Sequence, residues 1–184
     1  MLACQFGISV TRKDVLRNRE ILIDAAVAVL VGVGLDVSLD EIARSAGVSP
    51  STLYRHFVTR EDLVEAVLDR LVEGVRLRSQ IATALPDARA SFRRVFAEVC
   101  DLSGREVAAF AQLAATSERT ERFAQAIVLD IVGPATARLR EAQGLRSGVS
   151  DDDIVAFIRM VESSPSTQTQ RQMALEVLLD GLVV

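Results

Sequence analysis

The 184-residue chain is predicted to be all-α, on three observations. Apolar residues recur at spacings of three and four along most of its length, which is the period of an amphipathic helix. No segment alternates for long between apolar and polar residues, as a strand with one buried face would. Glycine and proline are few, at 10 and 4 residues, so most of the chain is free of residues that interrupt helices.

Composition and charge restrict the class of protein. Hydrophobic residues make up 49% of the chain, enough to bury a core, so disorder is not expected. The longest uncharged apolar run near the N-terminus, Ala25 to Leu35, has 11 residues and is too short to span a membrane. We therefore expect a cytoplasmic protein with no membrane partner. The net charge of −4 does not by itself indicate a nucleic-acid partner.

Residues that catalysis or metal binding would need are scarce. The chain has one histidine, His56, and two cysteines, Cys4 and Cys100, which have no zinc-ligand spacing. We find no Ser/His/Asp arrangement and no phosphate-binding loop in the sequence. The sequence therefore disfavours an enzyme, and we expect no metal and no cofactor.

The first helix is predicted from about Asp14 to Val33. Its apolar stripe consists of Leu22, Ala25, Ala26, Val29, Leu30 and Val33. Gly34 is placed to end this helix, because glycine adopts the left-handed backbone conformation without strain. Four basic residues gather at the start of the helix: Arg12, Lys13, Arg17 and Arg19.

A short second helix is marked at both ends. Ser38 can cap it, and Glu41 stands three residues later, which is the capping-box pattern. Gly47 ends this helix after only two turns. Too short to be stable alone, it must pack against its neighbours.

A second cap follows at once. Ser49 precedes Pro50, and proline is favoured at the first helical position because its missing N–H costs no hydrogen bond there. Leu53 and Phe57, four residues apart, give this third helix its buried side. Two short helices joined by a turn of three or four residues that contains glycine form a helix-turn-helix.

The rest of the chain is predicted to be helical too. Thr59, with Asp62 three residues later, would cap a longer helix from Arg60 to about Arg78. Further helices are expected over residues 86–102, 105–116, 118–142, 152–162 and 169–181. Gly133-Pro134 predicts a kink or a break in the third of these.

The stretch from Arg17 to Arg70 resembles the N-terminal half of the tetracycline-repressor (TetR) family of bacterial transcription regulators. The resemblance rests on "IL" and "AA" in the first helix and on "IARSAGVS", "TLYRHF" and "REDL". It implies a helix-turn-helix DNA-binding domain at residues 12–58, a linking helix at about 60–78, and a helical effector-binding and dimerisation domain at residues 79–184.

The third helix would present the DNA-contacting residues, because Leu53 and Phe57 leave its other sides exposed. The resemblance further implies that Ser38, Thr52, Tyr54, His56 and Arg60 match positions that usually touch the operator. The full set of candidates is Ser38, Ser49, Ser51, Thr52, Tyr54, Arg55, His56 and Arg60. Other roles stay open: the serines could act only as caps, Tyr54 could pack its ring on the first helix, and Arg55, His56 and the basic run near Arg17 could simply be solvated. Which residues read bases and which hold phosphates is also open.

Two further candidate sets lie in the C-terminal part. An apolar ligand pocket could be lined by Phe92, Phe96, Cys100, Phe110, Leu113, Phe123 and Ile127; the alternative is that these residues simply make the core. The last two helices are apolar on more than one side, which predicts a four-helix dimer interface that includes Ile154, Phe157, Ile158, Val161, Leu175, Leu178, Leu179 and Leu182. The alternative is a monomeric core.

The sequence thus predicts a homodimeric regulator that binds double-stranded palindromic operator DNA. The expected mode is repression, relieved by a small, largely apolar effector whose identity the sequence does not give. Two alternatives stay open: activation, and a DNA-binding dimer that has no small-molecule effector.

Overall fold

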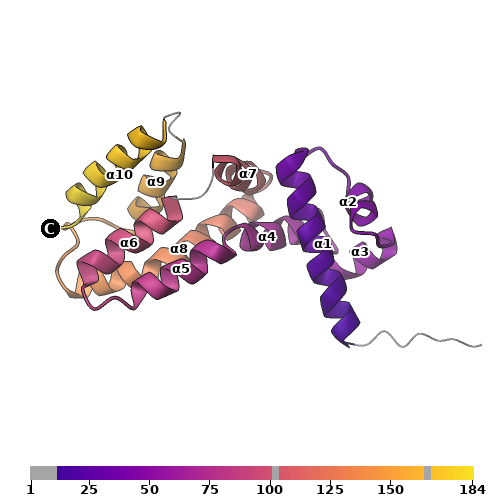
Figure 1. Ribbon diagram of the computed structural model, residues 1–184, viewed down its shortest axis with the longest axis horizontal. Helices are drawn as coiled ribbons and strands as arrows, with labels where there is room; N and C mark the ends of the chain where they lie inside the picture. Colours follow the sequence, from indigo (N-terminus) through magenta and orange to yellow (C-terminus); the bar gives the residue numbers. More distant parts are fainter. Residues whose placement is uncertain (1–11, 101–103, 164–166) are drawn as a thin grey trace, which may run out of the picture. The chain divides into compact units, whose positions relative to one another are not determined.

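The computed structural model describes residues 12–100, 104–163 and 167–184. Within them the chain forms ten helices, and no strand is longer than an isolated bridge (Figure 1). The prediction of an all-α fold is therefore confirmed. The helices divide into two compact units, of which the first ends at Val67 and the second runs from Leu68 to Val184. The division falls within the predicted linking helix.

The first unit is a three-helix bundle completed by the start of a fourth helix. Its elements are α1 (Arg12–Gly32), α2 (Leu39–Ser45), α3 (Pro50–His56) and the first part of α4 (Arg60–Leu71). α1 packs against both short helices, and α2 packs against α3. The core residues that these helices share are Leu22, Ile23, Ala26, Leu30, Ile42, Ala43, Leu53, Phe57, Leu63, Val64 and Val67. This packing stabilises two helices that would not persist alone.

The stripe predicted for α1 is wrong at its C-terminal end. Val33 is 78% exposed and follows the last helical residue, whereas Ile23, which lies outside the predicted stripe, is buried. The chain leaves the helix at Gly34, whose φ of +125° favours glycine, and so the stripe ends at Leu30.

The long helix predicted over residues 60–78 is two helices. α4 ends at Leu71, and α5 (Glu73–Thr83) begins after Val72, whose backbone (φ −99°, ψ 2°) leaves the helical region. Valine and glycine are weak helix formers, and Val72 and Gly74 stand together at this point. The Val72 side chain is 4% exposed, so burying it compensates for the interruption.

The second unit contains α5 and five more helices: α6 (Ala88–Cys100), α7 (Gly104–Ala114), α8 (Glu118–Glu141), α9 (Asp151–Ser163) and α10 (Gln168–Leu182). α6 and α8 are central, since α6 packs against α5, α8 and α9, while α8 packs also against α5, α7 and α9. α10 packs on α9. The largest side chains buried at the centre of this unit are Phe92, Phe96, Leu113, Leu139, Ile154 and Ile158.

The kink or break predicted at Gly133-Pro134 does not end α8, which runs unbroken from Glu118 to Glu141. Pro134 removes one backbone hydrogen bond, which would have joined its nitrogen to the Asp130 carbonyl. Both residues are exposed, so water can satisfy that carbonyl. The opposite face of the helix is fully packed, and this burial holds the helix together through the proline.

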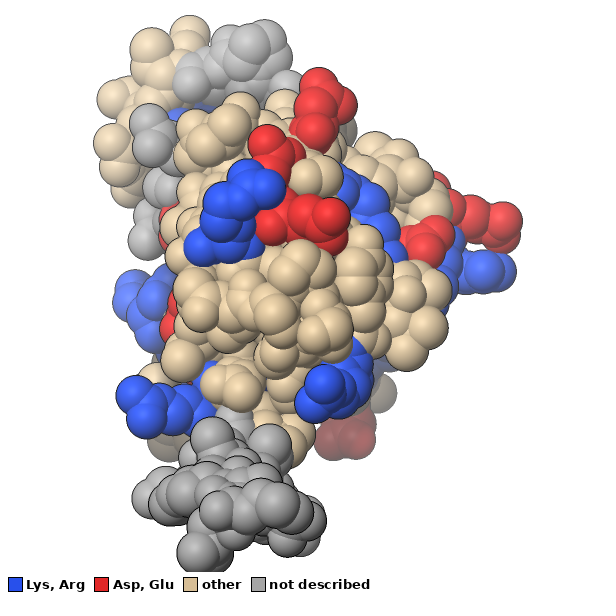
Figure 2. Space-filling view, turned by 90° about the vertical axis from the view of Figure 1, so that its right-hand side faces the viewer, with Lys and Arg blue, Asp and Glu red and all other residues tan. Residues whose placement is uncertain are grey.

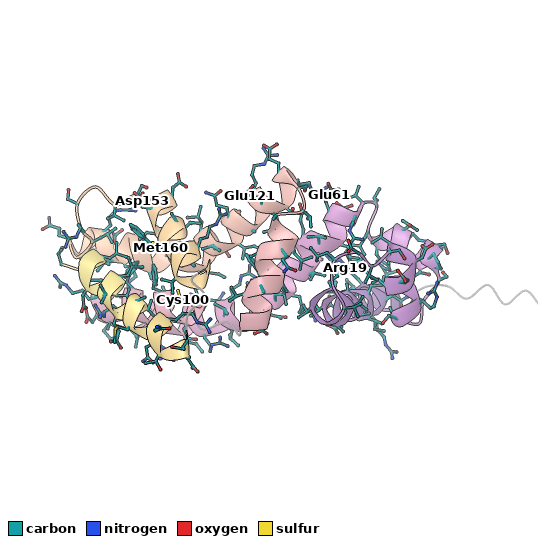
Figure 3. All side chains as sticks on the ribbon, turned by 90° about the horizontal axis from the view of Figure 1, so that it is seen from above. Arg19, Glu61, Cys100, Glu121, Asp153 and Met160 are labelled. Carbon is teal, nitrogen blue, oxygen red and sulfur yellow. The ribbon has the colours of Figure 1, made fainter. Side chains whose placement is uncertain are left out.

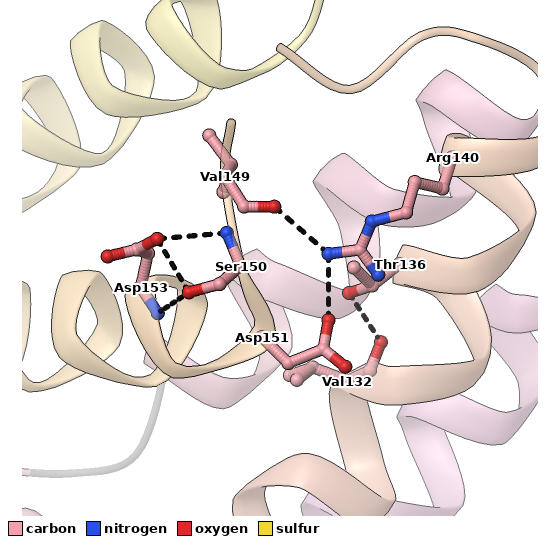
Figure 4. A network of polar contacts seen from close by, with 7 residues as sticks. All are labelled: Val132, Thr136, Arg140, Val149, Ser150, Asp151 and Asp153. Carbon is pink, nitrogen blue, oxygen red and sulfur yellow. Dashed lines mark hydrogen bonds and ion pairs between the residues drawn. The ribbon is translucent and has the colours of Figure 1, made fainter. Parts of the chain in front are cut away.

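Capping bonds and a salt bridge fix the start of α9 (Figure 4). Ser150 donates its backbone N–H to Asp153 Oδ2 at 2.9 Å, and the Asp153 N–H returns a bond to Ser150 Oγ at 3.1 Å. These bonds hold the pKa of the Asp153 carboxyl below its usual value. Arg140 of α8 pairs with Asp151 at 2.8 Å and thereby ties α9 to α8.

Candidate nucleic-acid interface and ligand cavity

The turn between α2 and α3 is built by backbone and capping bonds. The Ser38 N–H donates to Glu41 Oε2 at 2.9 Å, and the Glu41 N–H donates to Ser38 Oγ at 3.3 Å, which completes the predicted capping box. These bonds from Ser38 lower the pKa of the Glu41 carboxyl. Gly47 has a φ of +69°, and the Val48 N–H bonds to the Ala43 carbonyl at 3.0 Å, so the chain reverses sharply after α2.

The orientation of α3 follows from two buried residues. Leu53 is 0% and Phe57 1% exposed, as their spacing predicts. Ser49 caps the helix by accepting the Thr52 N–H at 3.3 Å, and Pro50 occupies the first turn. Because one side of α3 is fixed against α1 and α2, its other sides must face outward.

Three hydroxyl groups gather at the start of α3. Ser49 Oγ lies 2.9 Å from Ser51 Oγ and 2.9 Å from Thr52 Oγ1. Ser49 and Ser51 are exposed, and Thr52 is half-buried. Hydroxyls beside the free N–H groups of a helix start can donate to a phosphate oxygen.

The exposed flank of α3 carries the larger candidate side chains. Tyr54 is 48% exposed and Arg55 is exposed, so neither is needed for the core. His56 is half-buried beside Phe57, with ring centroids 6.5 Å apart. Figure 2 shows the face of the molecule that carries α2 and α3, where uncharged surface lies between separate groups of basic and acidic side chains.

The surroundings of His56 favour its neutral form. Partial burial lowers the pKa of its imidazole, and the positive charges of Arg19 and Arg55 lower it further. A neutral imidazole offers one N–H donor, while its protonated form offers two and carries the charge that suits a phosphate. The surroundings of His56 therefore make its protonation sensitive to an approaching anion.

Arg19 contacts the residue that ends α3, and this contact was not predicted. Its guanidinium carbon lies 5.3 Å from the centroid of the Phe57 ring (Arg19 is labelled in Figure 3). The sequence places Arg19 only in the basic run before the first apolar stripe, since residues 38 positions apart give no periodic signal. Arg17 of that run is exposed, whereas the side chains of Arg12 and Lys13 lie outside the described part of the chain.

Arg60 holds the loop before α2. Its guanidinium donates from Nη1 to the Val37 carbonyl at 2.8 Å and from Nη2 to the Leu35 carbonyl. Two of its donors are thus used inside the first unit, at a half-buried position. This geometry favours a structural tie over the phosphate contact expected from the sequence.

A cavity of about 600 Å³ lies in the second unit among α7, α8, α9 and α10. Of the seven predicted pocket residues, only Phe110 lines it. Four others are core residues that are less than 5% exposed: Phe92, Phe96, Leu113 and Ile127. Phe123 and Cys100 are half-buried and do not line this cavity. The sequence missed the actual lining because it is made largely of alanine and valine, which periodicity cannot tell from core.

Most predicted dimer residues are buried within one chain. Five are at most 5% exposed: Ile154, Ile158, Val161, Leu179 and Leu182. They form core contacts within one chain and so leave little surface for a second copy. Phe157, Leu175 and Leu178 are half-buried. The exposed apolar residues of α9 and α10 are instead Met160, Met173 and Val177, at 56, 63 and 68% (Met160 is labelled in Figure 3).

Among the described residues, none of the helices is both long and apolar enough to cross a membrane. In the same residues, histidine, cysteine and carboxylate side chains form no cluster of three or more that could hold a metal ion.

Residues 22–67 match the family model of bacterial regulatory proteins of the tetR family. The chain is similar to the HTH-type transcriptional regulator BetI of Rhizobium meliloti, with 32% identity over 61% of this chain and 58% of the relative. It is also similar to the uncharacterized HTH-type transcriptional regulator Rv0472c of Mycobacterium tuberculosis, with 35% identity over 39% of this chain. The matches span 31% of the Rv0472c sequence and at most 58% of any of these curated relatives.

Solved structures extend the similarity along the chain. The TetR transcriptional regulator SCO0520 of Streptomyces coelicolor matches 90% of this chain and 98% of its own, at 26% identity and a TM-score of 0.57. A putative TetR-family regulator from Rhodococcus sp. matches 92% of this chain and 100% of its own at a TM-score of 0.69. At 18% sequence identity, this match supports the fold alone. With the helix-turn-helix geometry, these similarities show that the chain belongs to the TetR family of transcriptional regulators.

Proposed function

We propose that the chain binds a palindromic operator as a homodimer and represses transcription from the neighbouring promoter. The observation that carries the proposal is the outward face of α3, where Tyr54 and Arg55 are exposed while Leu53 and Phe57 fix the helix beneath them. A helix presented in this way fits the major groove, with its N-terminal part toward the bases. Arg55 can donate two bonds to guanine or pair with a phosphate.

The hydroxyl groups at the start of α3 would fix the helix on the DNA backbone. Ser51 and Thr52 lie on the first turn of that helix, and each hydroxyl can donate to a phosphate oxygen. Ser38 offers a second helix start, at α2, although its capping bonds to Glu41 compete for its hydroxyl. Phosphate contacts set the orientation of the protein, and base contacts set its specificity.

Dimerisation would use the apolar surface of α9 and α10. Met160, Met173 and Val177 are more than half exposed, and half-buried Phe157 and Leu178 lie on the same two helices. Burying large apolar side chains against a second copy removes them from water, at about 25 cal/mol for each Å² of apolar surface. A symmetric pair of such surfaces would place two copies of α3 on successive half-sites.

An apolar small molecule in the cavity of the second unit would release the operator. The cavity of about 600 Å³ lies within the size range of ligand sites and is lined mainly by apolar residues. Release needs only that the ligand binds more tightly to a conformation that fits the operator poorly, with a coupling of about 1–3 kcal/mol. The alternative is a dimer that uses no small-molecule effector, in which case the cavity would have no regulatory role.

A footprinting experiment tests this function. The full-length protein is mixed with the DNA that flanks its own gene, and the protected bases are mapped. We expect protection of two inverted half-sites whose centres lie about one helical turn, or a multiple of it, apart. Protection of a single asymmetric site, or of no site at concentrations far above those that saturate specific complexes, would contradict the proposal.

A further inference from the structure

The cavity in the second unit combines apolar walls with a small set of charges. Ten of its thirteen lining residues are alanine, valine, isoleucine or phenylalanine, and the other three are Glu121, Arg159 and Arg171. Four of the five alanines come from α7 and the residue that follows it, and their short side chains leave the space open. The apolar walls therefore suit the apolar part of a ligand, and the three charged side chains determine which polar group the ligand can carry.

Two of the three charges belong to one ion pair near the solvent. Arg159 Nη1 of α9 lies 3.7 Å from Glu121 Oε1 of α8, and the two side chains are 51% and 58% exposed (Glu121 is labelled in Figure 3). A pair this exposed contributes little to stability and can rearrange when a ligand arrives. It does not neutralise the third charge.

Arg171 is the charge without a partner. It is half-buried on α10, and within the described residues its guanidinium is bonded to no carboxylate and no carbonyl; its backbone N–H makes the helical bond to the Thr167 carbonyl at 3.0 Å. Five N–H donors of a planar, permanently charged group therefore border an apolar space. The lining carries one net positive charge.

A ligand that fills this space removes water from Arg171. A neutral apolar ligand would leave a desolvated cation without compensation, which is unfavourable. An ammonium group would also be repelled by both arginines. A carboxylate can accept two parallel bonds from the guanidinium and so replaces the lost water.

We propose that the cavity binds an amphipathic organic anion, with an alkyl or aryl body against α7 and α8 and a carboxylate on Arg171. The inference rests on the proposed effector site and specifies the chemical class of its ligand. Bound in this way, the ligand joins α10 to α7 and α8 through one molecule.

Matched probes that differ only in the polar group test this inference. We would measure the dissociation constants of decanoate, 1-decanol and decylamine, and of 2-naphthoate and 2-naphthol, by isothermal titration calorimetry on the full-length dimer or monomer as purified. At least one carboxylate is expected to bind about ten- to a hundredfold more tightly than its alcohol, since a hydrogen bond to a charged group favours the acid by this factor. The two bodies distinguish an alkyl from an aryl ligand.

Substitutions of single charged residues test whether Arg171 is the group that binds the carboxylate. Arg171→Gln should remove the preference for the acid over the alcohol, while binding of the alcohol stays within about threefold. Glu121→Gln should tighten carboxylate binding, because it removes the negative charge of the lining. Arg122→Gln is the matched control: Arg122 also lies on α8, is 71% exposed and does not line the cavity, so its variant should bind like the parent protein.

Thermal unfolding of each variant confirms that it is folded. Equal binding of acid and alcohol by the parent protein, or an unchanged preference in Arg171→Gln, would overturn the inference. Failure of all five probes to bind would overturn it as well. Operator binding is measured separately with and without the bound carboxylate: if the acid binds at Arg171 and the operator complex is unaffected, the inference stands and the proposed release mechanism fails.

Discussion

The guanidinium of Arg19 lies over the ring of Phe57, 5.3 Å from its centroid, and so joins α1 to the end of α3. Phe57 is 1% exposed. The positive charges of Arg19 and Arg55 lower the pKa of the neighbouring His56. A residue from the basic run of α1 therefore contacts the end of the candidate reading helix.

Arg19→Ala should lower the free energy of unfolding by about 0.5–1 kcal/mol, the typical value of a cation–π contact at an exposed site. The same change should raise the pKa of His56, because a neighbouring positive charge is removed. Chemical denaturation and an NMR titration of the single histidine measure the two effects. Arg17→Ala is the control, since Arg17 is exposed on the same helix and makes no contact with Phe57. Equal effects of both variants would contradict the role of Arg19.

Operator binding should strengthen relative to that of His56→Gln as the pH falls below about 7. Burial and two arginines lower the pKa of free His56 from 6.5, and an adjacent phosphate would raise it again in the complex. Between the two pKa values the complex binds more protons than the free protein, so acid favours the complex. Fluorescence anisotropy from pH 8 to pH 5.5 at constant salt measures the difference, and parallel curves for both proteins would exclude a phosphate contact.

Folding stability has the opposite pH dependence. The folded-state pKa of His56 is lowered, so the unfolded chain binds a proton first as the pH falls through 6.5. The stability contributed by neutral His56 is present above pH 6.5 and is lost as the pH falls through the folded-state pKa. The anisotropy experiment must therefore be limited to the pH range in which thermal unfolding shows a folded protein.

Arg60→Ala should destabilise the first unit by about 1.5–3 kcal/mol, because hydrogen bonds from a charged group have roughly that value. The guanidinium bonds to the carbonyls of Val37 and Leu35, and its loss would leave both without this donor. Arg60→Lys should recover only part of the loss, since one ammonium cannot reproduce the planar pair of donors. Normal stability of Arg60→Ala with weakened operator binding would instead assign Arg60 to the DNA contact.

Val177→Asp should convert the dimer to a monomer at concentrations where the parent protein is dimeric. Val177 is 68% exposed on α10, and a carboxylate there would be desolvated by a second copy. Analytical ultracentrifugation measures the change. Leu77→Asp, at a comparably exposed apolar position on α5, is the control and should leave the assembly unchanged. Dimerisation by both variants would show that the interface lies elsewhere.

Sequence reasoning predicted the local signals of the first unit well. The caps at Ser38 and Ser49, the turn at Gly47 and the inward side of α3 are confirmed, because each depends on residues within four positions. The break at Val72 was not predicted, since the helical spacing of apolar residues continues across it. Contacts between distant residues, such as Arg60 with Val37 and Arg19 with Phe57, leave no periodic pattern in the sequence.

The second unit shows the limit of periodicity more clearly. Apolar residues on several sides of α9 and α10 were interpreted as a dimer surface, yet Ile154 and Ile158 are buried in the chain's own core. The spacing of apolar residues shows which side of a helix is apolar, but it does not show which neighbouring element covers that side. Arg171 was not singled out for the same reason, because its importance comes from three other helices that surround one cavity.

The affinity of Arg55→Ala and His56→Ala for the footprinted operator, at fixed salt, tests the central claim most directly. We predict that Arg55→Ala weakens binding about tenfold or more and His56→Ala to a smaller extent, since a bidentate base contact is worth about 1–3 kcal/mol. Their thermal unfolding should match that of the parent protein, and Arg122→Ala in the second unit should bind normally. If both variants bind the operator as tightly as the parent protein, the exposed face of α3 is not the DNA-reading surface.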